Sequence, residues 1–396
     1  MSKSKHICFV APRFPEGPTA GGAETLLRNL AERAVLKGQK VTFLTTCAKN
    51  HFTWANELPA GRKDIDGLEV IFFPVDEDRN IKAFLQVQDT ISRGSSVTRD
   101  EEDLWLRNNI NSKALCEHLR KHGNKYDRIV TGPYLFGLIY FASLIHPEKT
   151  LLVPCLHDEP FAYLDCFNEM FRKVSAIIFN SEPERDLACR LFDLSDKKSA
   201  AELHVIGMGF TPFKADAESF STDHNVTAPY VLYCGRREAM KGTPLLIDYL
   251  TAFRARTGKD IKLVLTGTGI VDIPDEFAPH VIDLGLVSET EKRRAMAGAT
   301  VFCHPSVNES FGIVLMESWL AGTAALVHAK SEVLRYQCSK SNGGLWFRSY
   351  PEFEEELMLL LEKPELRRKL GDAGREYVLR EYSWEKVEER FFKALE

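Results

Sequence analysis

Short apolar segments alternate with longer amphipathic segments along the sequence, in two successive series. In segment 23–38, for example, Leu26, Leu27 and Leu30 recur at helical spacing, and the apolar segment 40–46 follows. The apolar segments are continuous runs, which is typical of strands that are buried on both faces of a parallel sheet. Strands that alternate with helices in this way predict an α/β fold with doubly wound parallel sheets.

A polar segment without periodicity, 211–228, separates the two series. The chain has 396 residues, which is enough for two domains at about 150 residues each. We therefore expect two Rossmann-like domains, over residues 1–212 and 229–378, joined by a linker over residues 213–228. Helical sequence follows to the C-terminus, over residues 379–396.

The net charge and the cysteine content indicate which partners and which cellular compartment to expect. A net charge of −5 gives no basic excess of the kind that nucleic-acid binding requires, so we expect no nucleic-acid partner. Nine cysteines without a C-x-x-C pair indicate a reducing compartment. The apolar run before Pro12 is too short for a signal peptide, and the longest apolar stretch, 135–145, is below the roughly 18 residues of a membrane span. We expect a cytoplasmic protein, free or in weak peripheral contact with the inner face of the membrane.

Two glutamates flank a predicted helix start in the second domain. Glu309 lies in the loop after the apolar segment 299–305, and Glu317 lies about one and a half turns inside the helix predicted at 311–321. The free N–H groups of such a helix start attract a phosphate, and a carboxylate one turn further along can accept hydrogen bonds from the diol of a ribose. The alternative is a helix-start acid followed by a solvated glutamate.

A basic loop follows the first predicted strand of the same domain. Gly235 is followed by Arg236 and, five residues after that arginine, by Lys241. Arginine binds phosphate oxygens through two parallel hydrogen bonds and lysine binds them as a point charge, so this loop suits a diphosphate. The alternative is a solvated basic turn. Because the loop and the helix start belong to one domain, together they favour a nucleoside diphosphate.

These segments resemble the motifs of one enzyme family in their order and spacing. The run from Glu309 to Glu317 resembles the E-x7-E motif of retaining, family-four-type glycosyltransferases with the GT-B fold, and the loop 235–242 resembles their diphosphate loop. Further pieces resemble the same family: the GGAE run at 21–24, LHDEP at 156–160, AIIFNS at 176–181, LHVIGMGF at 203–210 and REYSWEKVEERF at 380–391. The resemblance implies a GT-B fold, in which two Rossmann-like domains face each other across a cleft and the C-terminal helix returns to the N-terminal domain.

The resemblance also implies roles for the matching positions. The positions that match catalytic residues are His157, Arg236, Lys241 and Glu309. Those that match donor-binding residues are Gly21, Gly22, Gly267, Val287, Phe311, Gly312, Ile313, Val314 and Glu317. In the family, the second glutamate holds the ribose, the first faces the donor sugar, and the two cations neutralise the leaving diphosphate.

The implied reaction transfers a hexosyl group from a nucleoside diphosphate sugar to a hydroxyl group with retention of configuration. A UDP-sugar is favoured as donor and a GDP-sugar is the second choice, while the acceptor is a glycan, a lipid-linked molecule or a small molecule. No cofactor and no metal is expected, because the two cations supply the positive charge. One alternative is a nucleotide-sugar 2-epimerase of the same fold. The other is a protein that binds sugar nucleotides without catalysis.

Two acidic pairs match the D-x-D pattern that holds a metal in glycosyltransferases of the other main fold. They are Asp64 with Asp66, and Asp76 with Asp78. Pairs of acids two positions apart arise often by chance, so we expect neither of them to bind a metal. Residues 77–103 are expected to form a polar loop and residues 104–122 a single helix.

Overall fold

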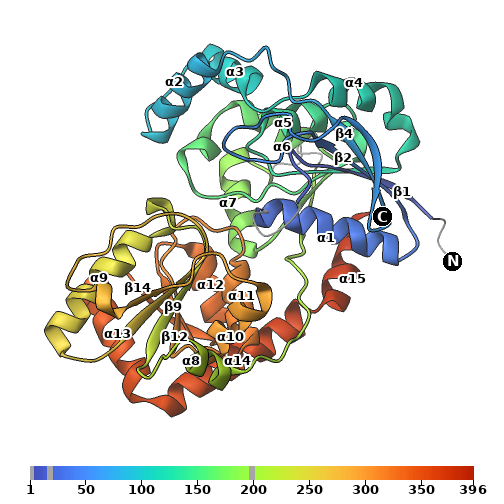
Figure 1. Ribbon diagram of the computed structural model, residues 1–396. Coiled ribbons are helices and arrows are strands. Elements are labelled where there is room, and N and C mark those ends of the chain that lie inside the picture. Colours follow the sequence, from blue (N-terminus) through green and yellow to red (C-terminus); the bar gives the residue numbers. More distant parts are fainter. Residues whose placement is uncertain (1–3, 16–20, 196–200) are drawn as a thin grey trace. The chain divides into compact units, whose positions relative to one another are not determined.

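The computed structural model describes residues 4–15, 21–195 and 201–396. The chain divides into two compact units (Figure 1), the first made of Met1–Gly207 and Glu388–Glu396 and the second of Met208–Val387. The chain therefore leaves the first unit after Gly207 and re-enters it at Glu388, rather than at the positions near 212 and 379 that the sequence suggests.

The first unit contains an eight-stranded sheet in the order β3-β4-β2-β1-β5-β6-β7-β8. Its strands are β1 (His6–Val10), β2 (Lys40–Thr46), β3 (Gly61–Ile65), β4 (Leu68–Phe73), β5 (Arg128–Thr131), β6 (Thr150–Leu152), β7 (Ala176–Phe179) and β8 (Glu202–Val205). All neighbours pair in parallel except the edge hairpin of β3 and β4. The helices are α1 (Gly22–Leu36), α2 (Ile81–Ser92), α3 (Arg99–Asn108), α4 (Lys113–His122), α5 (Gly137–Ser143), α6 (Cys166–Lys173) and α7 (Glu182–Phe192).

The second unit contains a six-stranded parallel sheet in the order β11-β10-β9-β12-β13-β14. Its strands are β9 (Tyr230–Cys234), β10 (Lys262–Thr266), β11 (Val281–Asp283), β12 (Val301–His304), β13 (Ala325–His328) and β14 (Gly344–Phe347). Its helices are α8 (Ala217–Asp223), α9 (Thr243–Thr257), α10 (Glu289–Gly298), α11 (Ile313–Leu320), α12 (Glu332–Ser341), α13 (Tyr350–Glu362) and α14 (Pro364–Glu381), and α15 (Trp384–Ala394) ends the chain. These two sheets agree with the predicted pair of α/β domains.

The segment predicted to be a linker folds as part of the second unit. It contains α8, which Asp216 caps by accepting hydrogen bonds from the N–H groups of the helix's first turn. Phe220 of α8 is fully buried against Tyr230 of β9. Polar residues that make this segment look like a linker form a helix cap at Asp216 and an ion pair at Asp223, while their side chains stay exposed.

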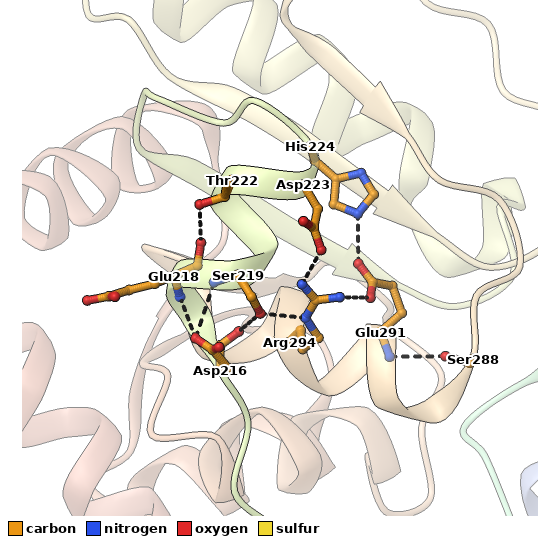
Figure 2. A network of polar contacts seen from close by, with 9 residues as sticks. All are labelled: Asp216, Glu218, Ser219, Thr222, Asp223, His224, Ser288, Glu291 and Arg294. Atoms are coloured by element: carbon orange, nitrogen blue, oxygen red, sulfur yellow. Dashed lines mark hydrogen bonds and ion pairs between the residues drawn. The ribbon is translucent and has the colours of Figure 1, made fainter.

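A polar network fastens α8 to α10 (Figure 2). Arg294 of α10 forms an ion pair with Asp223 and donates a hydrogen bond to Ser219 Oγ at 2.8 Å. Glu291 Oε1 lies 2.7 Å from His224 Nε2. The face of α10 that carries Glu291 and Arg294 therefore holds α8.

The polar region of the first domain is more helical than predicted. Residues 81–92 form α2, and the single helix expected over 104–122 is two helices, α3 and α4. Asn111 separates them, because its side-chain amide donates hydrogen bonds to three carbonyls, those of Leu106, Arg107 and Asn109. Local side-chain bonds of this kind compete with helix continuation.

Candidate functional site

The order of the strands places a site at the carboxyl ends of β9 and β12. The chain runs outward from β9 through β10 to β11 and then returns to the other side of β9 with β12. Ligands of open α/β sheets bind at such a reversal, beyond the carboxyl ends of the two strands. The basic loop follows β9 and the loop of Glu309 follows β12, so the topology brings these two predicted segments together.

Lys241 and Glu309 form an ion pair at this point. The Nζ of Lys241 lies 2.7 Å from Oε1 of Glu309, and Nε2 of His304 lies 3.1 Å from the same oxygen. Burial alone would raise the pKa of Glu309, but Lys241 and His304 outweigh it and hold that pKa well below its usual range. Glu309 is therefore a carboxylate at neutral pH. The sequence does not predict His304, although it lies only five residues before Glu309.

Gly242 allows the loop of Lys241 to lie against the strand end of β12. It adopts a φ of +74°, and a Cβ atom there would lie 2.6 Å from the carbonyl oxygen of Pro305. A larger residue would therefore separate the two loops that carry Lys241 and Glu309.

The helix start predicted near residue 311 lies at Ile313. Gly312 is the residue that precedes it, with a φ of +89°, and a Cβ atom there would meet the side chain of Leu334 at 2.7 Å. Ile313 and Val314 lie in the first turn, so their N–H groups have no partner within the helix. Phe311 is buried, and its ring packs against those of Phe210 and Tyr382. This start offers main-chain donors and a positive dipole end to an anion.

Glu317 pairs with a lysine that was not predicted. Both oxygens of Glu317 lie 3.0 Å from Nζ of Lys292 on α10, and Lys292 also pairs with Glu289 at 2.9 Å. Burial raises the pKa of Glu317 even though Lys292 opposes it. Burial would lower the pKa of Lys292, but Glu317 and Glu289 outweigh it and raise that pKa. The E-x7-E glutamates thus each have their own lysine, one from the loop after β9 and the other from α10.

The two arginines of the basic loop have different surroundings. Arg236, the predicted phosphate ligand, is half exposed and lies 3.2 Å from Glu238. Arg237 is buried and forms an ion pair with Asp283 at the end of β11. The sequence shows two adjacent arginines and offers no periodicity that separates the exposed one from the buried one.

Val287 and Gly267 lie in the loops that follow β11 and β10. The N–H of Gly267 donates to the carbonyl of Gly285 at 2.7 Å, two residues before Val287. Gly267 has a φ of +117°, and a Cβ atom there would lie 2.0 Å from the carbonyl oxygen of Gly235. The loops after β9, β10 and β11 are therefore in direct contact.

In the first unit, Gly21 and Gly22 form the start of α1. Gly21 precedes the helix, and its N–H donates to Oε2 of Glu24 at 3.0 Å. Arg13, which follows β1, forms two hydrogen bonds with the carboxylate of Glu24, at 2.7 and 2.8 Å. The rest of the predicted glycine-rich loop includes residues 16–20, which lie outside the described residues.

His157 follows β6 and is partly exposed. Its Nδ1 lies 3.7 Å from Oε1 of Glu159, and the same oxygen accepts a hydrogen bond from the hydroxyl of Tyr134 at 3.3 Å. The main-chain N–H of the preceding residue, Leu156, donates to the buried Glu184 at 2.6 Å. His157 thus lies on a strand end that is fixed from α7.

The two D-x-D pairs have structural partners. Asp76 accepts a hydrogen bond from the N–H of Lys113 at 3.0 Å, and Asp78 pairs with Nζ of the same lysine. Asp66, in the turn between β3 and β4, pairs with Arg28 at 2.7 Å. Within residues 4–15, 21–195 and 201–396, three or more His, Cys, Asp or Glu side chains do not gather as a metal site would require. The helices in these ranges also contain no stretch that is long and apolar enough to cross a bilayer.

Comparison with known proteins identifies a family model and relatives that each match part of the chain. Residues 214–377 match the family model described as Glycosyl transferases group 1. The phosphatidyl-myo-inositol mannosyltransferase of Mycobacterium tuberculosis is 32% identical over 177 residues, which cover 42% of this chain and 46% of the relative. The chain therefore matches somewhat less than half of the length of this relative.

Solved structures match almost the whole chain. Sucrose-phosphate synthase from Thermosynechococcus elongatus has a TM-score of 0.69 at 17% identity, covering 98% of both chains. Anabaena Alr3699/HepE in complex with UDP and glucose has a TM-score of 0.68 at 14% identity, covering 99% of both chains. The fold is therefore GT-B, with two parallel-sheet α/β domains, as the sequence resemblance implies.

Proposed function

We propose that this protein is a retaining glycosyltransferase that moves a hexosyl group from a nucleoside diphosphate sugar to a hydroxyl group. The observation that carries the proposal is the pairing of Lys241 with Glu309 at the strand reversal of the second unit, 2.7 Å apart, in the segment that matches the glycosyltransferase family model. This site combines a cation for the diphosphate with an ionised carboxylate for the donor sugar.

The charges of the site suit the leaving group. In the proposed step, the bond between the sugar C1 and the diphosphate oxygen breaks, and a bond from the acceptor oxygen to C1 forms on the same face. The acceptor proton passes to the departing phosphate. Lys241, Arg236 and the first turn of α11 would stabilise the negative charge that develops there, and fixed charges of this kind are the largest contribution in many enzymes. We propose that these groups make a metal unnecessary.

The other predicted residues keep roles that the family resemblance implies. Glu317, with Lys292 beside it, would accept hydrogen bonds from the ribose hydroxyls, and the loop of Val287 would meet the base. In the first unit, Gly21 and Gly22 are proposed to contact the donor, and His157 is proposed to contact the reacting sugar.

The names of the relatives support particular choices of donor and acceptor. The Anabaena structure holds UDP and glucose, which supports a UDP-sugar as donor. The mycobacterial relative is named for a mannosyl group and for phosphatidyl-myo-inositol, which supports a hexosyl group and makes a lipid-linked acceptor one choice beside a glycan. We place the protein in the cytoplasm, free or at the inner face of the membrane.

The test uses purified full-length protein. A thermal-shift screen with UDP, GDP and ADP identifies the nucleotide, because a ligand at 100 times its Kd stabilises the native state by about 2.7 kcal/mol. The matching sugar nucleotides are then incubated with glycan and lipid-linked acceptors, with and without EDTA. We expect acceptor-dependent release of the nucleotide, unaffected by EDTA, and a product with the anomeric configuration of the donor.

Each alternative outcome overturns a defined part of the proposal. Conversion of the donor into its 2-epimer without acceptor would identify an epimerase instead. Nucleotide binding without any turnover would leave a binding protein. An inverted product would refute retention, and loss of activity in EDTA would refute metal independence.

A further inference from the structure

Arg237 connects three loops at the carboxyl edge of the second sheet. Its Nη1 and Nη2 each lie 2.5 Å from one oxygen of Asp283, which ends β11. The same guanidinium donates to the carbonyls of Gly267 at 3.2 Å and Gly269 at 3.4 Å in the loop after β10. Its own N–H donates to the carbonyl of Thr268 at 2.7 Å.

The contacts continue toward the segment proposed to meet the base. Oδ1 of Asp283 accepts a hydrogen bond from the N–H of Gly285 at 2.8 Å, and the carbonyl of Gly285 accepts one from Gly267. Gly285 directly precedes Leu286 and Val287. The position of this loop is therefore coupled to the guanidinium through Asp283.

These loops contain several glycines, which favour no single main-chain conformation by themselves. Four glycines, Gly235, Gly267, Gly269 and Gly285, have φ values of +146°, +117°, +106° and +60°. Glycine loses more conformational entropy than other residues when it is ordered, so a glycine-rich loop pays more to adopt one geometry. Arg237 is buried, with 5% of its side chain exposed, and an ion pair at such a position holds the loops in place before any ligand arrives.

We propose that Arg237 is a positioning residue for nucleobase recognition, which holds the loops after β10 and β11 so that main-chain groups near Val287 face the base in one geometry. The inference rests on the proposed function, because that function places the base at Val287. In this proposal, the protein discriminates between bases because this loop is rigid. Arg237 does not itself touch the nucleotide.

The experiment compares base preference between the wild type and two variants. The Kd values of UDP, GDP and ADP are measured by calorimetry for the wild type, Arg237→Met and Lys241→Met. A rigid loop should discriminate between bases by about tenfold or more, since one or two lost hydrogen bonds change a Kd by that factor. Arg237→Met is expected to weaken binding of the preferred nucleotide, because the loop must then become ordered when the nucleotide binds. It is also expected to reduce the preference to within about threefold, because a loop without one fixed geometry can adapt to each base. Lys241→Met is expected to raise the Kd values of all three nucleotides by one common factor.

A matched control lies at the amino ends of the strands in the same sheet. Arg254 pairs with Asp260 at 2.9 Å and donates to the carbonyls of Lys259 and Ile261, before the start of β10. Arg254→Met thus removes the same kind of contacts and should leave base preference unchanged. Asp283→Asn and Arg237→Lys provide milder variants if Arg237→Met fails to fold. Both should show an intermediate preference and faster hydrogen exchange at residues 284–287.

The results separate this inference from the proposed function. If the wild type prefers one nucleotide and the Arg237 and Asp283 variants keep that preference, the inference is wrong and the function stands. Equal binding of all three nucleotides by the wild type also overturns the inference. Binding of none of them refutes the proposed function together with the inference.

Discussion

Lys241 and Glu309 lie 2.7 Å apart although 68 positions separate them in the sequence. The strand order brings them together, because β9 and β12 are neighbours in the sheet and each residue follows one of these strands. One carboxylate oxygen of Glu309 is shared by Lys241 and His304, and Lys241 retains further N–H donors for a phosphate. The pair thus joins the part of the site proposed for the diphosphate to the part proposed for the sugar.

Replacing Lys241 by methionine should lower turnover by about ten- to a hundredfold. A hydrogen bond to a charged group contributes about 1.5–3 kcal/mol, and about 1.4 kcal/mol corresponds to a factor of ten. Nucleotide release from the donor sugar measures the effect. Lys259→Met is the control, because Lys259 forms an exposed ion pair with Glu362 in the same unit. Equal turnover in the two variants would remove Lys241 from the reaction.

Much of this part of the site follows from the sequence. Glycines and cations after one apolar run, and two glutamates around the next helix start, predict a phosphate site from local chemistry. Two partners, Lys292 and Asp283, do not follow, because they meet Glu317 and Arg237 through tertiary contacts that no spacing in the sequence shows. His304 is close to Glu309 in the sequence, but no pattern there indicates that its ring reaches the carboxylate. Arg236 and Arg237 are adjacent, and only the fold decides that the second of them is buried.

The fold was predictable where strands and helices alternate and less so in polar regions. The strand β2 lies at 40–46, where the sequence has an apolar segment, whereas α2 and α8 lie in segments predicted to be a loop and a linker. These two helices are short, and they are held by caps such as Asn80 and Asp216 and by packing on other elements. Helices of this length gain most of their stability from tertiary contacts, which periodicity does not reveal.

Replacing Glu317 by glutamine should weaken nucleotide binding more than it weakens turnover at saturating donor. The amide keeps only one acceptor oxygen for the ribose diol and loses the charge that pairs with Lys292, which corresponds to about ten- to a hundredfold in Kd. Calorimetry with the nucleotide found in the thermal-shift screen measures this change in Kd. Glu354→Gln is the control, since Glu354 is a similarly buried carboxylate that pairs with Arg256 on the same unit. An unchanged Kd in Glu317→Gln would exclude the ribose role.

Replacing Gly312 by alanine should destabilise the second unit and displace the start of α11. The residue has a φ of +89°, and a Cβ atom there would lie 2.7 Å from Leu334, so strain of about 1–3 kcal/mol and a steric clash combine. Gly322→Ala is the matched control, because Gly322 has a φ of +85° with no neighbour within 4 Å of its Cβ position. Urea unfolding should show a larger decrease in the free energy of unfolding for Gly312→Ala than for Gly322→Ala. Similar losses would mean that the contact with Leu334 has no effect.

The buried Glu184 should make the stability of the first unit depend on pH. It accepts hydrogen bonds from the main-chain N–H groups of Leu156 and Asn180, both at 2.6 Å, beside the strand end that carries His157. Burial raises the pKa of Glu184 to about 8, although these N–H groups oppose the shift. Unfolded, the same carboxyl loses its proton near pH 4.5. Between these values the native state holds a proton that the unfolded state has released, so stability falls as pH rises from about 4.5 to about 8.

Glu184→Gln has no proton to lose in this range and should abolish that slope. Each pKa unit of the shift corresponds to about 1.4 kcal/mol, so the wild type should lose a few kcal/mol between pH 5 and pH 8 that the variant does not lose. Native-state hydrogen exchange of the amides in β6 and β7 measures this free energy at several pH values. Glu182→Gln changes a neighbouring carboxylate in the same first turn of α7 and should keep the wild-type slope. If the slope persists in Glu184→Gln, another group of the first unit is responsible, and the carboxyl of Glu184 is ionised throughout this range because its main-chain donors outweigh its burial.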